Sequence, residues 1–91
     1  MATIAAWMNI DGQSVIPAVQ QAAKQLESTV GEVFLDFSSV RRIDSSSLRA
    51  IAELASTAEQ KDVKVVLRGV SVDVYKVLKL MKLTSRFSFV H

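Results

Sequence analysis

The chain has 91 residues, of which 49% are apolar and 22% charged, and its formal net charge is +2. A chain of this length and composition forms one ordinary globular domain, which excludes a wholly disordered protein. The eleven Lys and Arg residues are scattered among nine acids, so no dense basic tract favours nucleic acid, and the absence of cysteine excludes disulfides, thiolate zinc sites and cysteine nucleophiles.

The first predicted element is a strand. Residues 3–10 form an apolar run that stops at the turn signal Asp11-Gly12, and such a bounded run is typical of a strand. Trp7 lies inside this run, and we expect it to pack at an edge of the core rather than to anchor a partner on the surface.

An amphipathic helix is predicted next. Ser14 suits its N-cap, and Pro17 falls in the first turn, where its missing N–H costs little. Gly31 is expected to end this helix. Its buried stripe is predicted to consist of Ile16, Val19, Ala23, Leu26 and Val30.

A second strand and a second helix follow. Residues 32–37 are a short, nearly continuous apolar run, which indicates a strand covered on both faces. After a polar, basic connection, Asp44 or Ser45 can cap the next helix, which is expected to end at Lys61-Asp62. Its buried stripe is predicted to consist of Leu48, Ile51, Ala52, Ala55 and Ala58.

The last third of the chain repeats the pattern. Residues 63–67 alternate as a strand does, Gly69 ends that strand, and Ser71 caps a third helix with Asp73 in its first turn. Residues 87–90 read as a short final strand. The buried stripe of the third helix is predicted to consist of Val74, Val77, Leu78 and Met81, with Lys76, Lys79 and Lys82 on a solvated side.

The element order is therefore βαβαβαβ. Strands that alternate with amphipathic helices predict an α/β fold in which the helices pack on a mainly parallel sheet of about four strands. The whole chain, residues 1–91, is expected to form this single domain. The N-terminus lacks a signal-peptide pattern and no apolar run approaches the roughly 18 residues of a membrane helix, so we expect a cytoplasmic protein without membrane insertion.

The connection before the second helix is the richest candidate site. It carries Arg41, Arg42, Asp44 and the serines 45–47, and parallel sheets gather their sites at the carboxyl ends of the strands. A serine at a helix N-terminus can accept a phosphate without disturbing the local fold. Taken alone, however, such a serine run is more typical of a helix cap than of a modification site.

Catalysis has little support in the residues. The only histidine is His91, the last residue, so a serine nucleophile has no obvious base. Neither metal-ligand spacing nor a phosphate-binding or dinucleotide loop is present. We therefore expect a protein that is not an enzyme and that uses no metal or cofactor.

Two segments taken together resemble the signature of STAS domains, the family of anti-sigma-factor antagonists and of domains in sulfate transporters. They are residues 33–38 (VFLDFS) and residues 43–48 (IDSSSL). The downstream segment 65–70 (VVLRGV), followed by a Leu-rich helix, also fits, and the resemblance runs from about residue 3 to residue 91. It implies a STAS-like fold for the single domain.

The resemblance also implies a function and a site. In antagonist members the serine after the Asp is phosphorylated by a kinase that is itself an anti-sigma factor, and phosphorylation makes the two proteins separate. Ser45 stands at that position, so the chain is expected to be a non-enzymatic partner-switch regulator. The residues expected to flank the phosphosite and dock the partner are Asp36, Arg41, Arg42, Asp44, Ser46, Ser47, Leu48 and Arg49.

Two departures from the family keep an alternative open. Ser47 stands where the family usually has glycine, and the extra strand that members often carry before residue 3 is missing, which leaves a sheet edge that could pair in a homodimer. Short STAS-like chains also serve as constitutive accessory subunits of ABC-type lipid transporters. Under that alternative the serine run is only a helix cap, and neither reading involves direct contact with nucleic acid.

Overall fold

Four strands and three helices alternate along the chain in the order that the sequence predicts. The computed structural model describes the backbone of residues 3–90 and the side chains of residues 6–90, so His91 lies outside the described residues. The elements are β1 (Thr3–Asn9), α1 (Val15–Gln25), β2 (Thr29–Asp36), α2 (Ser45–Lys61), β3 (Lys64–Arg68), α3 (Val72–Leu80) and β4 (Ser88–Val90). Two short 3₁₀ turns, η1 (Leu26–Ser28) and η2 (Thr84–Arg86), complete the fold.

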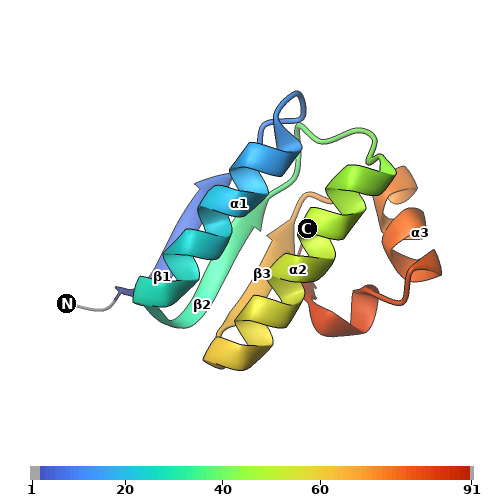
Figure 1. Cartoon of the computed structure of the whole chain (residues 1–91). Coiled ribbons are helices and arrows are strands. Elements are labelled where there is room, and N and C mark those ends of the chain that lie inside the picture. Colours follow the sequence, from blue (N-terminus) through green and yellow to red (C-terminus); the bar gives the residue numbers. More distant parts are fainter. Residues whose placement is uncertain (1–2, 91) are drawn as a thin grey trace.

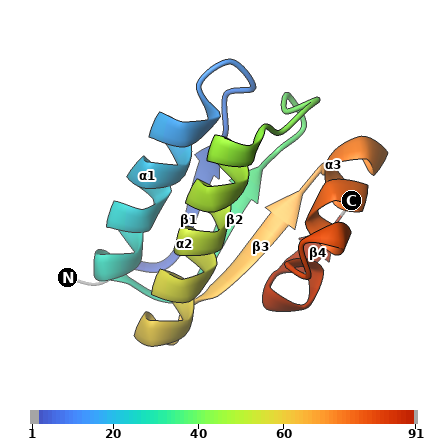
Figure 2. The same ribbon diagram turned by 45° about the vertical axis from the view of Figure 1, so that its right-hand side comes forward.

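The four strands form one parallel sheet in the order β1-β2-β3-β4, which confirms the predicted α/β class. Figures 1 and 2 show α1 and α2 side by side across one face of this sheet. Right-handed crossovers that always advance in the same direction place every helix on one face. Accordingly, Val74 and Leu78 of α3 join the same core as the strand residues beneath α1 and α2.

The core lies between this helix layer and one face of the sheet. Phe37, directly after β2, is the largest of its fully buried side chains. The strands contribute Val33, Leu35, Val65 and Leu67, and the helices contribute Val19, Ala22, Ile51, Leu54, Val74 and Leu78. Loop residues Ile10 and Val40 are also fully buried, so the loops that carry the candidate site are anchored in the core.

The opposite face of the sheet carries no helix among residues 3–90. The prediction that residues 32–37 are covered on both faces is therefore wrong, because Val33 and Leu35 are buried while Phe34 is only half-buried. Trp7 is 56% exposed and stacks on Phe34 with the ring centroids 5.9 Å apart. The expectation that Trp7 packs at an edge of the core is wrong for the same reason.

The boundary between α1 and β2 also differs from the prediction. The helix ends at Gln25, and the strand starts at Thr29, whose hydroxyl donates to the Gln25 carbonyl at 2.6 Å. Gly31 lies inside β2 with φ of 107°, where the pairing with β1 shifts by one residue. A glycine with positive φ accommodates such a bulge, so Gly31 bends a strand here instead of ending a helix. Val30 is consequently 62% exposed and not part of a buried stripe.

The end of α3 is the other departure. The helix stops at Leu80, and Lys82 turns the chain with φ of 59°. Met81 lies three residues after the buried Leu78, and this spacing would bury it only if the helix continued. It is instead 57% exposed, which makes its predicted burial wrong.

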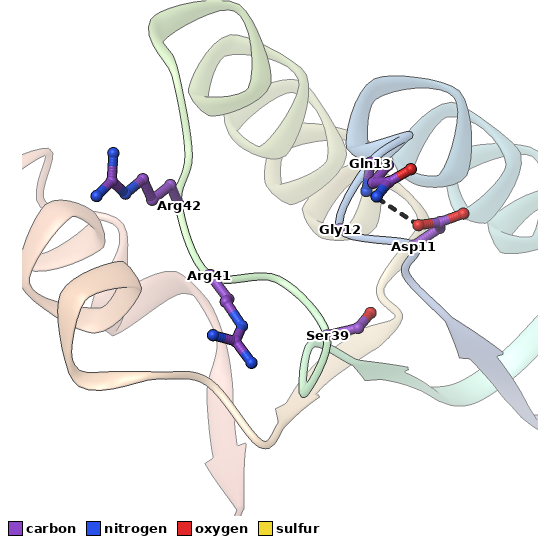
Figure 3. A pocket seen from close by; sticks show the side chains of 6 residues that line it. All are labelled: Asp11, Gly12, Gln13, Ser39, Arg41 and Arg42. Carbon is purple, nitrogen blue, oxygen red and sulfur yellow. Dashed lines mark hydrogen bonds between the residues drawn. The ribbon is translucent and has the colours of Figure 1, made fainter.

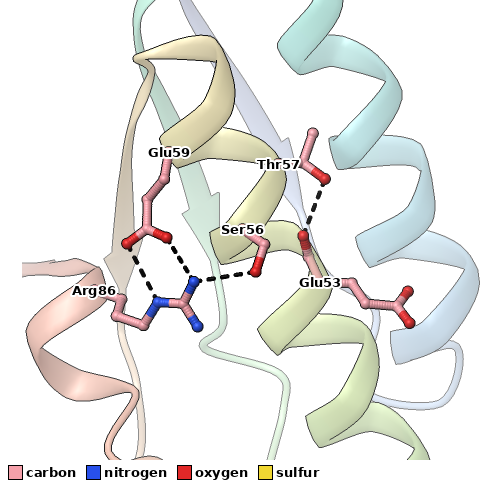
Figure 4. A network of polar contacts seen from close by, with 5 residues as sticks. All are labelled: Glu53, Ser56, Thr57, Glu59 and Arg86. Atoms are coloured by element: carbon pink, nitrogen blue, oxygen red, sulfur yellow. Dashed lines mark hydrogen bonds and ion pairs between the residues drawn. The ribbon is translucent and has the colours of Figure 1, made fainter.

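A polar network fastens the segment after α3 to α2 (Figure 4). The guanidinium of Arg86 donates to both carboxylate oxygens of Glu59 and to the Ser56 hydroxyl. The hydrogen bonds from Arg86 lower the pKa of Glu59. The backbone N–H of Arg86 donates to the Leu83 carbonyl at 3.0 Å, so this network also holds Leu83 beside α2.

Candidate functional site

The carboxyl ends of β1 and β2 are tied together, and this sets where α1 and α2 begin. The N–H of Ile10 donates to the Asp36 carbonyl at 2.9 Å, and the Ser39 hydroxyl donates to the Ile10 carbonyl at 2.9 Å. Gly12 lies directly against the backbone of Ser39. The two loops therefore pack on each other, and a narrow hollow between the two helix N-termini is lined by residues of both loops.

Asp44 and Ser45 open α2. The Asp44 carboxylate accepts the Ser47 N–H at 2.7 Å, which confirms Asp44 as the cap. The pKa of Asp44 is lowered, first by this backbone hydrogen bond and then by the Ser47 hydroxyl. Ser45 and Ser46 are exposed, whereas Ser47 is only 6% exposed. Of the three serines, only the first two are open to a kinase or to the surface of a partner.

A groove lies beside Ser45, between the start of α2 and the end of α3. We call it the Ser45 groove, and it is lined by Ser45, Leu48, Arg49, Ala52, Met81 and Leu83. Its walls are mostly apolar, and Arg49 supplies a cation. The structure thus brings three of the predicted residues, Ser45, Leu48 and Arg49, to one surface. Met81 and Leu83 are functional candidates that the sequence reasoning missed, because it assigned Met81 to the core.

Arg41 and Arg42 line a second, open hollow of about 530 Å³ with Asp11, Gln13 and other loop residues. Both arginines are exposed, and neither forms an ion pair within residues 3–90. Figure 3 shows the two guanidinium groups pointing in different directions and away from Gln13. They therefore do not converge on one point where a phosphate could be held, and they suit contacts with acids of a larger partner.

Asp36 lies apart from Ser45. Its carboxylate accepts from the Ser38 N–H at 2.9 Å and from the Ser38 hydroxyl at 2.6 Å, and Arg68 lies 3.9 Å away. These two hydrogen bonds, followed by the charge of Arg68, lower the pKa of Asp36. Asp36 is in register with Arg68, two residues from Phe34, so its side chain lies on the uncovered face of the sheet. The structure does not bring it together with the serines of α2.

The site presents open hollows and two exposed serine hydroxyls. Among residues 3–90, no group of three or more His, Cys, Asp or Glu side chains could hold a metal ion. None of the helices formed by these residues is both long and apolar enough to cross a membrane.

The lowered pKa of Asp44 predicts a pH dependence of stability. A carboxyl group whose pKa is lower in the folded state than its usual 3.8 contributes stability above that value, and this contribution is lost as the pH falls through the folded value. In Asp44→Asn the side chain can still cap the helix but no longer titrates. We expect the free energy of unfolding of the wild type to fall more steeply than that of Asp44→Asn below pH 3.8, in urea titrations at successive pH values. Equal slopes would contradict the role of Asp44.

Comparison with known proteins gives the following matches. The family model described as STAS domain matches residues 7–90. The STAS domain of a SulP transporter from Vibrio cholerae has a TM-score of 0.78 and 14% identity, over 99% of this chain and 76% of that one. A proposed anti-sigma factor antagonist from Thermotoga maritima has a TM-score of 0.65 and 22% identity, over 92% of this chain and 71% of that one. A search of curated proteins finds no significant match.

Proposed function

The chain belongs to the STAS domain family, and we propose that it is a non-enzymatic docking module whose binding to a protein partner is switched by phosphorylation of Ser45. One observation carries this proposal: Ser45 is an exposed hydroxyl on the first residue of α2, and it lines a largely apolar groove. A modification there changes the surface on which a partner would dock and leaves the core untouched.

The start of α2 suits a phosphate physically. Unpaired N–H groups and the helix dipole favour negative charge at a helix N-terminus, so the domain can stay folded after modification. The phosphate would add about −1.5 to −2 charges next to Asp44, which is ionised at neutral pH. Like charges that meet at an interface cost several kcal/mol, so a partner that presents acids or apolar surface would be released.

Arg49 adds a second consequence of phosphorylation. It lies four residues after Ser45 in α2 and lines the same groove, and residues four apart share one side of a helix. A phosphate on Ser45 would pair with this guanidinium and withdraw the cation of the groove from the partner. The flanking residues Ser46, Leu48, Arg41 and Arg42 would form the rim of the contact, with Ser47 buried beneath it.

The partner of this proposal is a serine kinase that is also an anti-sigma factor. The support comes from the serine pair at the start of α2 and from the fold shared with the proposed antagonist of Thermotoga maritima. The kinase reaction uses ATP, so the proposal includes a cytoplasmic location.

A constitutive accessory subunit of an ABC-type lipid transporter is the second candidate. The observation that favours it is the apolar lining of the Ser45 groove, which is typical of permanent contacts. Under this candidate Asp44 and the serines serve only as the cap of α2. Binding to the transporter ATPase would then tolerate a negative charge at position 45, unless Ser45 itself lies in the contact.

The test uses four baits in a lysate of the native host: wild type, Ser45→Ala, Ser45→Asp and Ser28→Asp. Ser28 is an exposed serine in the turn η1 that follows α1, and it controls for an added charge. We expect a kinase-like ATPase to be held by three baits and lost with Ser45→Asp, and the purified kinase with ATP to add one phosphate at Ser45, detected by mass spectrometry. A kinase held equally by Ser45→Asp would refute the switch. Transporter subunits held by all four baits would establish the second candidate.

A further inference from the structure

The uncovered face of the sheet has a regular chemistry that the proposed function does not use. Residues two apart on a strand, and residues in register on parallel neighbours, point to the same face. The uncovered face therefore consists of three rows that run across the strands. The middle row is Trp7, Phe34, Val66 and Ser88, and the flanking rows are Glu32 with Lys64, and Asn9, Asp36, Arg68 and Val90.

The middle row is apolar from Trp7 to Val66 and ends in Ser88, and it is open to solvent at Trp7 and Phe34, whereas Val66 is only 3% exposed. Trp7 is 56% exposed, stacks on Phe34, and has the Arg68 guanidinium 5.6 Å from its ring centroid. Val66 follows in register on β3. All-parallel sheets occur almost only with both faces covered, because their strands are apolar on both sides. The face with Trp7 and Phe34 therefore has the character of a surface that a further layer would cover.

The two flanking rows show which layer fits. Each row has an acid on β2 and a base on β3, namely Glu32 beside Lys64 and Asp36 beside Arg68. A two-fold axis parallel to the strands and midway between β2 and β3 would lay β2 of one copy over β3 of another. Each acid would then face the base of the other copy in its own row, which gives four attractive contacts in all, and Phe34 would face Val66.

Other occupants fit this pattern less well. A two-fold axis that runs across the strands along the middle row would put Glu32 over Asp36 and Lys64 over Arg68, with like charges facing. A nucleic acid strand would meet the two carboxylates as well as the two basic side chains of this face. The carboxylates would repel its phosphates. All four charged groups are complemented only by a layer that places bases over the acids of β2 and acids over the bases of β3. A second copy of the chain supplies such a layer.

We propose that the uncovered face is a self-association surface, on which two copies pack sheet against sheet in parallel alignment. Packed sheets lie about 10 Å apart, with strand directions within about 30° of each other, which this axis allows. The contact is isologous, since each residue pair occurs twice. A face only four strands wide is smaller than a standard interface, so we expect a dissociation constant in the micromolar range. This contact leaves the Ser45 groove free and does not depend on the proposed function.

Sedimentation equilibrium of the purified full chain over a concentration series tests the dimer. Trp7 is the only tryptophan, so its fluorescence should shift to shorter wavelength as the concentration rises and the face loses water. A chain that stays monomeric up to about 1 mM, far above any micromolar dissociation constant, would refute the proposal. A dimer with unchanged Trp7 fluorescence would also refute it, since the contact would then lie elsewhere.

Two charge reversals identify the pairing. Glu32→Lys presents two bases in one row and Lys64→Glu presents two acids, so each variant alone should self-associate at least about tenfold more weakly than wild type. An equimolar mixture of the two should form a heterodimer, because every Lys of one then faces a Glu of the other. Lys24→Glu and Glu53→Lys, exposed on the helix layer, are the matched controls and should leave the wild-type dimer unchanged when mixed.

The mixing experiment separates the outcomes sharply. Recovery of the dimer only in the mixture supports the parallel two-fold arrangement, and variants that each dimerise as strongly as wild type refute it. Circular dichroism establishes whether each charge-reversal variant is folded. If one does not fold, Glu32→Gln and Lys64→Gln take its place, because they remove the attraction without adding repulsion. With the Gln pair, a weaker dimer supports the proposal and an unchanged dimer refutes it.

Discussion

Gly12→Ala is expected to destabilise the domain by about 3 kcal/mol, the upper part of the range for overpacked sites. A Cβ at this position would lie 2.1 Å from the carbonyl oxygen of Ser39 and 3.0 Å from its carbonyl carbon. Both are backbone atoms, so no side-chain rotation can relieve the contact. Urea unfolding should show a lower midpoint with an unchanged slope.

The neighbours of Gly12 explain why the backbone cannot simply move away. The Ser39 hydroxyl is bonded to the Ile10 carbonyl, and Val40, the next residue, is fully buried. A shift of this loop would disturb the core and also the start of α2, so we expect weaker binding of the partner at the Ser45 groove. Gln20→Ala, at an exposed position of α1 away from both loops, is the control and should change neither. A Gly12→Ala variant as stable as wild type would show that the two loops are not tightly packed.

Much of the fold could be predicted because the signals are local. Asp44 and Ser71 cap the second and third helices as expected, each accepting a backbone N–H three residues on. Gly69 ends β3 with φ of 71°, and Asp62 ends α2 in the left-handed region. Capping and turn chemistry act over a few residues, so the sequence alone indicates where α2 and α3 begin and where α2 and β3 end.

The features that could not be predicted depend on residues far apart in the chain. The helical spacing of apolar residues extends to Val30, but Val30 lies in β2, which pairs with β1 and has a bulge at Gly31. Within residues 3–90 the helices cover only one face of the sheet, and this follows from the strand order, in which every crossover advances in the same direction. Sequence periodicity does not contain this information, and for this reason the sequence predicts Trp7 at an edge of the core.

Some features of the candidate site depend on local sequence and could be predicted, and others depend on the tertiary fold and could not. The exposure of Ser45 at a helix start follows from local capping and could be predicted, whereas Met81 and Leu83 reach the groove only because α3 ends where it does. The separation of Asp36 from the serines can be predicted from the sequence. Side chains alternate along a strand, so a residue next to the buried Leu35 points to the other face.

Met81→Glu is expected to weaken binding of the protein partner at least about 30-fold, the effect of removing a central contact of an interface. Met81 lines the Ser45 groove and is 57% exposed, so a glutamate there places a charge in an apolar contact without disturbing the core. The domain should therefore keep its unfolding midpoint. Leu80→Glu is a close control, because Leu80 is the preceding residue, is 80% exposed and lines a different hollow with three lysines.

The comparison between these two neighbours locates the docking surface. Titration calorimetry with the captured partner should give a large loss for Met81→Glu and a small change for Leu80→Glu. Equal losses for both would indicate that the partner covers the whole end of α3, including the lysine side. Full binding by Met81→Glu would show that the partner does not enter the Ser45 groove, and the exposed rim with Arg41 and Arg42 would then have to carry the contact.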